Sequence, residues 1–283
     1  MGWISLEVDM ALAGVLGLLI GSFLNVVIHR LPKMLERQWA DECAALIRPE
    51  VPPQESEPLN LMVPRSRCGH CGHRIRWYEN IPVISFLWLK AECSNCHHAI
   101  SWRYPLIELA TGLLWSACAW RWGFSLSALA WAGFGSALLV LAAIDWDTTL
   151  LPDDITLPLV WAGICSTALG WTPTSLADST WGAVAGYLSL WLVFWAFKLA
   201  TGKEGMGYGD FKLFAALGAW FGWQALIPII LMSSVIGAMV GITMQFSSGL
   251  REGGYIPFGP FLALAGLTAM FTSPMAMLAW VGL

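Results

Sequence analysis

Long apolar segments separated by short polar ones make up most of this chain. The first segment runs from Val8 to Ile28, and seven more follow the polar stretch that ends near residue 103. A helix of about 20 apolar residues crosses the hydrocarbon core of a bilayer, and shorter segments cross it by local thinning. The pattern therefore predicts an all-α polytopic membrane protein with about eight transmembrane helices. The later segments are Tyr104–Trp120, Leu126–Ile144, Ile155–Leu169, Trp181–Leu199, Phe211–Trp223, Ala225–Phe246 and Pro257–Val281.

Charged residues indicate how these helices are oriented. Glu7 and Asp9 lie at the start of the first segment, where a signal peptide would carry basic residues, whereas Arg30 and Lys33 follow the segment. Positive residues favour the cytoplasmic side of a membrane, so we expect the N-terminus to lie outside. With eight spans, all of the 15 Lys and Arg residues except Arg121 then lie in or beside a cytoplasmic loop.

Composition agrees with the membrane assignment. The chain is 57% hydrophobic and 12% charged, whereas a soluble domain is about 25% charged. Its mean hydropathy is +0.62. Eighteen Trp residues suit a protein with two membrane interfaces, where the amphipathic indole ring is favoured.

Residues 33–103 differ from the rest because they are rich in Lys and Arg and contain five of the seven cysteines. Their proline-rich, acidic stretch 49–58 is typical of an extended loop. We therefore expect three parts: residues 1–32 with the first helix, a cytoplasmic insert over 33–103, and a seven-helix membrane core over 104–283.

The cysteines of the insert follow the pattern C-x2-C-x21-C-x2-C, which is typical of a zinc ribbon. Disulfides are the alternative, but they are disfavoured on the reducing side of the membrane. Four cysteine ligands leave no open coordination position, so the predicted zinc is structural. We expect the neighbouring histidines, His70, His73, His97 and His98, to be solvated, and Cys43, Cys118 and Cys165 to be ordinary core or loop residues. The predicted metal ligands are Cys68, Cys71, Cys93 and Cys96.

Two acidic residues lie at membrane boundaries on the same predicted cytoplasmic side. Asp210 follows a segment containing Gly205, Gly207 and Gly209, whose backbone can adopt tight turns. Asp145 directly follows an apolar segment and continues that helix. Carboxylates at such positions are unfavourable unless they have a function, so together they suggest a pair of proteolytic aspartates.

Structural explanations exist for each of these acids. Asp210 can cap a helix that begins at Phe211, and Lys212 can extend toward the interface. Asp153 or Asp154 can cap the next helix, and Asp147 can face water.

Four stretches, taken together, resemble the bacterial prepilin peptidases, which are membrane aspartic proteases of the GxGD type. They occur in the family's order and span nearly the whole chain: Gly21–Pro32, the four cysteines, Ile144–Asp153 and Gly207–Asp210. The resemblance implies that Asp145 and Asp210 are the catalytic pair, although Asp147 lies within the same motif. Pro257–Pro260 also resembles a proline-containing segment that lies near such sites.

The resemblance implies two activities. One cleaves the leader of type IV prepilins or type II secretion pseudopilins after glycine, on the cytoplasmic side of the bacterial inner membrane. The other methylates the new N-terminal residue, usually Phe, with S-adenosylmethionine. We expect Gly207 and Gly209 to contact the substrate backbone. The expected partners are the pilin precursors and membrane lipid, with no nucleic acid. The sequence has no glycine-rich cofactor fingerprint, so the methyl donor site is not located.

Two other functions fit part of the sequence. Intramembrane acids also occur in ion- or proton-coupled transporters, but these often have matched halves, and no internal repeat is evident. A membrane receptor that binds through its zinc module leaves both aspartates unexplained.

Overall fold

The computed structural model describes residues 2–47, 58–246, 256–272 and 274–281. It divides into two compact units, Met1–Phe124 and Ser125–Leu283. The loop predicted at 49–58 lies, except for its last residue, outside the described residues. Among the described residues there are helices and two isolated β-bridges but no strand, which confirms the all-α class.

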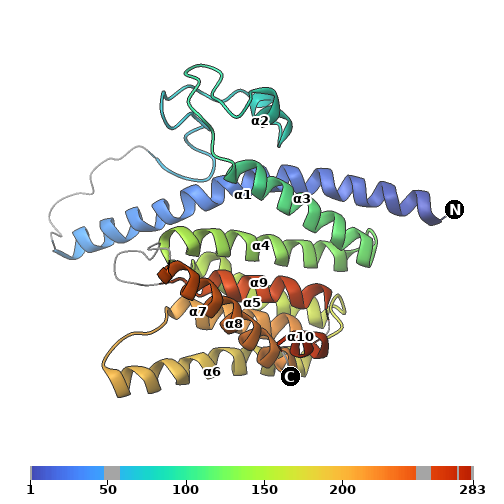
Figure 1. The fold of residues 1–283 in the computed structure, drawn as a ribbon, viewed down its shortest axis with the longest axis vertical. Helices are drawn as coiled ribbons and strands as arrows, with labels where there is room; N and C mark the ends of the chain where they lie inside the picture. Colours follow the sequence, from blue (N-terminus) through green and yellow to red (C-terminus); the bar gives the residue numbers. More distant parts are fainter. Residues whose placement is uncertain (1, 48–57, 247–255, 273, 282–283) are drawn as a thin grey trace. The chain divides into compact units, whose positions relative to one another are not determined.

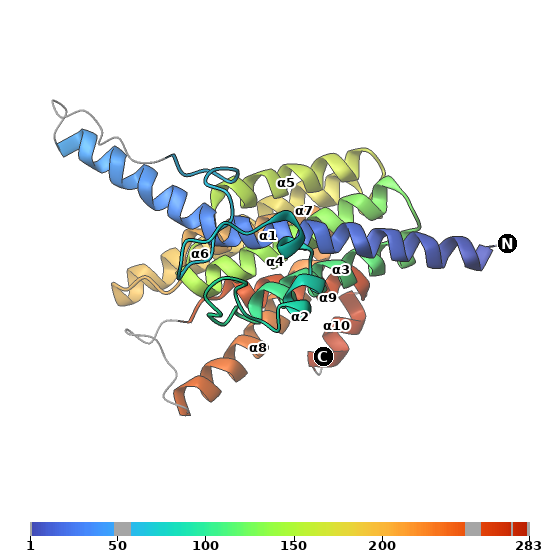
Figure 2. The ribbon, with the colours of Figure 1, turned by 90° about the horizontal axis from the view of Figure 1, so that it is seen from above.

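The first unit is built on two helices that pack along each other, α1 (Gly2–Ile47) and α3 (Arg103–Trp122). Figures 1 and 2 show them side by side. Small residues permit this approach, since a Cβ on Gly17 would lie 2.8 Å from the Thr111 carbonyl oxygen. Between these helices in sequence, the insert forms only the short helices η1 (Trp77–Asn80) and α2 (Ile84–Trp88).

Helix α1 is longer than its predicted apolar span. It runs unbroken past Ile28 and Pro32 to Ile47, and its residues from 36 to 47 are exposed. This polar extension contains several good helix formers, which explains why the helix continues after the apolar pattern ends. The expected boundary at residue 32 thus falls inside a helix, and the three-part division of the chain stays a prediction.

The second unit places a short helix at its centre. In α7 (Tyr208–Phe221), ten residues are buried, and the helix packs against neighbours on several sides (Figure 1). The other elements are α4 (Leu126–Thr148), α5 (Asp153–Ala168), α6 (Leu176–Thr201), η2 (Trp223–Ala225), α8 (Leu226–Phe246), α9 (Gly259–Phe271) and α10 (Pro274–Val281).

Helices occupy all eight predicted spans, with one difference at the end. The expected last span is two helices, α9 and α10, because Thr272 is extended and Pro274 begins a new helix. Four described helical segments are long and apolar enough to cross a membrane: Leu6–Ile47, Leu126–Thr148, Leu176–Thr201 and Trp223–Phe246. The protein is therefore a helical membrane protein.

Candidate functional site

Asp145 lies in the last turn of α4 and is 4% exposed. Its Oδ2 atom accepts a 3.0 Å hydrogen bond from the backbone N–H of Gly259, at the start of α9. A Cβ atom on Gly259 would lie 2.5 Å from the same oxygen. Only glycine fits there without displacing the carboxylate. The prediction that the Pro257–Pro260 segment lies near the site is confirmed by this contact.

Asp210 is the third residue of α7 and is also 4% exposed. The helix begins at Tyr208, earlier than predicted, so Asp210 is not its N-cap. Instead its Oδ2 atom accepts a 3.2 Å hydrogen bond from the N–H of Gly207, which is the N-cap residue. Its Oδ1 atom is buried and has no hydrogen-bond partner in the described part of the chain. A buried acceptor left in this state is unfavourable, so this oxygen is suited to a water or a proton.

Leu151 connects the two acidic segments. A Cβ on Gly209 would lie 2.5 Å from the Leu151 Cβ, and a Cβ on Gly259 would lie 3.2 Å from its Cδ1. The chain reaches Leu151 through a turn in which Thr149 has a left-handed φ of 56° and donates its N–H to the Asp145 carbonyl. The carboxylates of Asp145 and Asp210 lie close enough for their charges to interact.

The neighbouring acids have different surroundings. Asp147 is exposed at the end of α4. Asp153 lies in the first turn of α5, but Pro152 is the N-cap and no side chain caps the helix, so the predicted cap was wrong. Asp153 instead pairs with Lys212, whose Nζ lies 2.6 and 2.7 Å from its two carboxylate oxygens. This ion pair joins α5 to α7 beside the acidic pair, so Lys212 does more than extend toward the interface.

The two predicted substrate-binding glycines each have a contact within the chain. Gly207 donates its N–H to Asp210, and Gly209 packs against Leu151. Both residues are half-buried. Their contact with a substrate backbone stays a prediction.

The cysteine cluster of the first unit has the geometry of a metal site. The four Sγ atoms lie within 4.8 Å of one another. Cys68 and Cys96 are separated by 3.8 Å and Cys71 and Cys93 by 4.0 Å. Zinc–sulfur bonds of about 2.3 Å in a tetrahedron place sulfurs about 3.8 Å apart, so the cluster fits zinc. None of the four cysteines forms a disulfide, so all four are available as metal ligands.

The cluster is built from two equivalent turns, here called the first and second knuckles, residues 67–74 and 92–99. In the first, Gly72 donates its N–H to the Cys68 carbonyl, and in the second His97 donates to the Cys93 carbonyl. Both residues have a positive φ, 71° for Gly72 and 54° for His97. The second knuckle therefore places a side chain where the backbone favours glycine.

Backbone N–H groups favour the thiolate form of Cys68 and Cys71, the two cysteines of the first knuckle. The N–H groups of Cys71 and His70 lower the pKa of the Cys68 thiol to about 6. The N–H of His73 lowers the pKa of the Cys71 thiol. Because the thiolate is the form that binds metal, these donors prepare the knuckle for zinc.

The histidines are outside the cluster, and His70, His97 and His98 are exposed as predicted, whereas His73 is half-buried. His70 stacks on His98 with ring centroids 4.6 Å apart. The Nε2 atom of His73 lies 3.6 Å from Oε2 of Glu79, and the Nδ1 atom of His97 lies 3.4 Å from Oε2 of Glu92.

One buried carboxylate was missed in the sequence. Glu108 in α3 is 9% exposed, and its Oε2 accepts a 2.8 Å hydrogen bond from the N–H of Val83. Val83 has a φ of 60°, an unfavourable conformation for a β-branched residue. A charged residue within the apolar segment Tyr104–Trp120 was the available signal, because such residues are rarely present without a partner.

Comparison with known protein families finds one match in each half of the chain. Residues 15–122 match the bacterial peptidase A24 N-terminal domain, and residues 132–242 match the type IV leader peptidase family. The chain belongs to the type IV leader peptidase family. The cysteine cluster and Glu108 fall in the first match, and Asp145 and Asp210 fall in the second. Gly259 lies beyond both matched segments.

The relatives of this chain cover nearly its whole length. It is 53% identical over 257 residues to the prepilin leader peptidase/N-methyltransferase of Stutzerimonas stutzeri, covering 90% of this chain and 88% of that one. The protein of the same name from Pseudomonas aeruginosa is 53% identical over 255 residues, covering 90% and 87%. That from Burkholderia pseudomallei is 49% identical over 264 residues, covering 93% and 85%. No solved structure matches the chain.

Proposed function

We propose that this protein is a bifunctional enzyme. It cleaves the leader of type IV prepilins or type II secretion pseudopilins after glycine, and it then methylates the new N-terminal amine. The family membership and the names of relatives about half identical in sequence support both activities. The observation that carries the proteolytic part is the burial of Asp145 and Asp210 beside each other, each held by a glycine N–H.

Two carboxylates that share one proton are sufficient for peptide hydrolysis. In our proposal, the ionised member removes a proton from a water, whose oxygen then bonds to the carbonyl carbon of the glycine before the scissile bond. The protonated member donates its proton to the leaving amine as the peptide bond breaks. The unpartnered Oδ1 of Asp210 is the oxygen available for this exchange, since its Oδ2 is held by Gly207.

The glycine hydrogen bonds give the carboxylates a fixed orientation. Gly259 holds Asp145 from α9, while Gly207 holds Asp210 from the turn before α7. Fixed acid–base groups lower the entropy that must be lost on reaching the transition state. We propose that the substrate backbone lies along the segment that contains Gly207 and Gly209.

We propose that the protein resides in the bacterial inner membrane, with a periplasmic N-terminus and the acidic pair facing the cytoplasm. The apolar helix of the pilin precursor would then lie within the membrane, and its leader would lie in the cytoplasm. The distribution of Lys and Arg supports this orientation. The family membership argues against the transporter and receptor hypotheses.

Zinc and the methyl donor have separate roles in this proposal. Cys68, Cys71, Cys93 and Cys96 would hold a structural zinc, which would stabilise the insert without supplying an open coordination site. The methyl donor, S-adenosylmethionine, is a co-substrate that supplies an electrophilic methyl group to the free amine.

The proposal is tested with purified protein and a synthetic precursor peptide. The peptide carries a basic leader, the pair Gly–Phe and an apolar helix, and a matched peptide replaces Gly by Val. We expect cleavage after Gly, methyl transfer to Phe from labelled donor, and no cleavage of the Val peptide. Intact Gly peptide after incubation with folded protein would contradict the proposal.

A further inference from the structure

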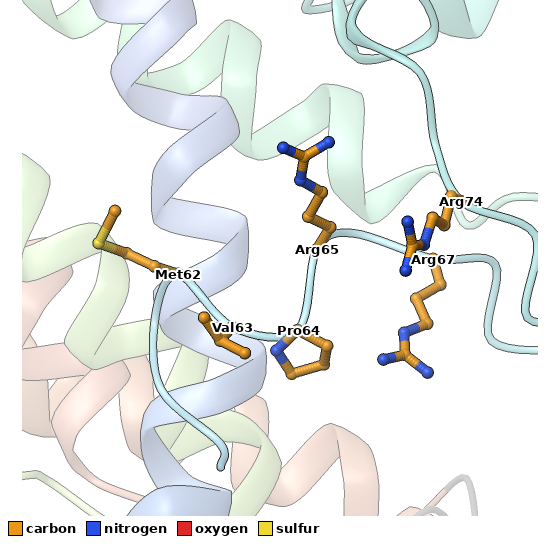
Figure 3. Close-up of a pocket in the computed structure, with 6 residues that line it drawn as sticks. All are labelled: Met62, Val63, Pro64, Arg65, Arg67 and Arg74. Atoms are coloured by element: carbon orange, nitrogen blue, oxygen red, sulfur yellow. The ribbon is translucent and has the colours of Figure 1, made fainter. Parts of the chain in front are cut away.

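A basic pocket in the first unit contains neither the two aspartates nor the four cysteines of the sites described above. Its volume is about 380 Å³, and half of the residues that line it are arginines (Figure 3). The lining residues are Met62, Val63, Pro64, Arg65, Arg67 and Arg74. Arg65 directly follows the loop formed by residues 60–64, and Arg67 and Arg74 belong to the first knuckle.

The loop that forms this pocket is held in place from α1. The guanidinium group of Arg30 donates hydrogen bonds of 2.9 Å to the Asn60 carbonyl and 2.6 Å to the Pro64 carbonyl. The Asn60 side chain in turn accepts the N–H groups of Met62 and Val63, at 2.8 and 2.7 Å. Arg30 is thereby used in building the loop. The remaining three arginines are presented by a backbone that is already ordered.

The position of two of these arginines is electrostatically unfavourable. Arg67 and Arg74 pair across an isolated antiparallel bridge, and like charges directly opposite each other are destabilising. Within the described ranges, neither of them nor Arg65 forms an ion pair with a carboxylate. An anion between the guanidinium groups would remove this repulsion.

The second knuckle shows that the fold does not need these arginines. The equivalent bridge there joins Glu92 and Ala99, with the same backbone pattern around its cysteines. Each knuckle contributes two cysteines to one metal site. If the arginines served only to balance the charge of the thiolates, the second knuckle would need them as well. The basic pair is therefore specific to the side that lines the pocket.

We propose that Arg67 and Arg74 form a binding site for a phosphate-bearing anion, with Arg65 adding positive charge nearby. A guanidinium group binds two phosphate oxygens at once, and several of them around one pocket favour a multiply bonded anion. Arg30 follows the apolar segment that ends at Ile28, so it holds the pocket near the level of lipid headgroups. The phosphate can come from an acidic phospholipid or from a soluble compound. The methyl donor of the proposed function carries no phosphate group, so it is not the ligand proposed for this pocket.

Two binding experiments distinguish the sources. Zinc-loaded protein in detergent is titrated with inorganic phosphate while its thermal unfolding is followed. The same protein is placed in nanodiscs of phosphatidylcholine with or without phosphatidylglycerol, and retained lipid is measured by native mass spectrometry. Phosphate alone as ligand indicates a soluble source, phosphatidylglycerol alone indicates a lipid, and binding of neither overturns the proposal.

Matched variants show whether the pocket is responsible. The double variant Arg67→Gln/Arg74→Gln is compared with Arg76→Gln/Lys90→Gln, which loses the same charge from the insert outside the pocket lining. We expect binding by the first to be at least roughly tenfold weaker and binding by the second to be unchanged. Equal losses in both would show a general charge effect and would overturn the proposal.

The relief of repulsion provides a second readout. Without anion, Arg67→Gln is expected to unfold at a higher temperature than the parent, and in saturating ligand at a lower one. If the double variant fails to retain zinc, Arg74→Lys keeps the charge but not the paired donors, and it should bind the anion more weakly than the parent. Parental binding by Arg74→Lys would then count against the site.

Discussion

The backbone N–H of Gly259 donates a 3.0 Å hydrogen bond to the Oδ2 atom of Asp145, which lies 114 residues earlier in the chain. This contact fixes one member of the acidic pair from the start of α9. The other member, Asp210, is fixed by a residue three positions away, Gly207. The site thus depends on one local and one long-range glycine donor.

Replacing Gly259 by Ala is expected to abolish most of the cleavage activity. The new Cβ would lie 2.5 Å from the Asp145 carboxylate and must displace it. A shift of about 1 Å at a catalytic group lowers rates by roughly a hundredfold. The initial rate of precursor cleavage measures this effect. Gly133→Ala in α4 is the control because a Cβ there meets no atom within 4 Å, so its rate should match the parent. Full activity of Gly259→Ala would show that the contact is dispensable.

The sequence predicted the helical class and the acidic pair because these rest on local patterns. Apolar segment length predicted the spans, and the position of Asp145 directly after such a segment predicted its place in the helix. The exposure of Asp147 agrees with the prediction that it faces water.

Contacts between distant segments could not be predicted in the same way. Nothing near Leu151 in the sequence indicates that its side chain packs against Gly209 and Gly259. The Asp153–Lys212 ion pair likewise joins residues 59 positions apart, whereas the local sequence around Asp153 predicts a helix cap. Such contacts depend on how α5, α7 and α9 pack, which a single sequence does not specify.

Zinc removal is expected to unfold the insert, because metal binding and folding are coupled in units with so little core. Purified protein should contain about one zinc per chain, and replacing Cys93 and Cys96 by Ser should remove it. Elemental analysis measures the metal, and limited proteolysis measures the order of the insert. Cys43→Ser is the control, because Cys43 is exposed and outside the cluster. Active, protease-resistant protein without zinc would contradict this prediction.

Gly72 and His97 occupy equivalent positions in the two knuckles, and substitutions at these positions should change the zinc affinity in different ways. Gly72→Ala introduces a side chain at a φ of 71° and should weaken zinc binding by roughly fivefold, which corresponds to about 1 kcal/mol. His97→Gly removes a side chain from a φ of 54° and should leave zinc binding equal or tighter. Competition with a chelator measures both affinities. A weaker site in His97→Gly would show that its contact with Glu92 outweighs the backbone strain.

Cleavage and methylation are expected to be separable. Methyl transfer needs a free amine and a sulfonium donor, and neither aspartate has a role in that chemistry. Asp210→Asn protein should therefore still methylate a pre-cleaved peptide that begins with Phe. Asn25→Ala should weaken methylation more than cleavage, because Asn25 belongs to the first unit whereas Asp145 and Asp210 belong to the second. Absence of methyl incorporation by folded Asp210→Asn protein would indicate a shared pocket.

The central claim is that Asp145 and Asp210 together hydrolyse the precursor. The most direct measurement is the cleavage rate of Asp145→Asn, Asp210→Asn and Asp147→Asn proteins, each verified as folded by its zinc content and thermal unfolding. The first two should lose roughly 10²- to 10⁴-fold in rate, because each change removes a proton carrier but little volume. Asp147→Asn should retain most of the activity, since Asp147 is exposed. An inactive Asp147→Asn protein beside an active Asp145→Asn protein would contradict the account.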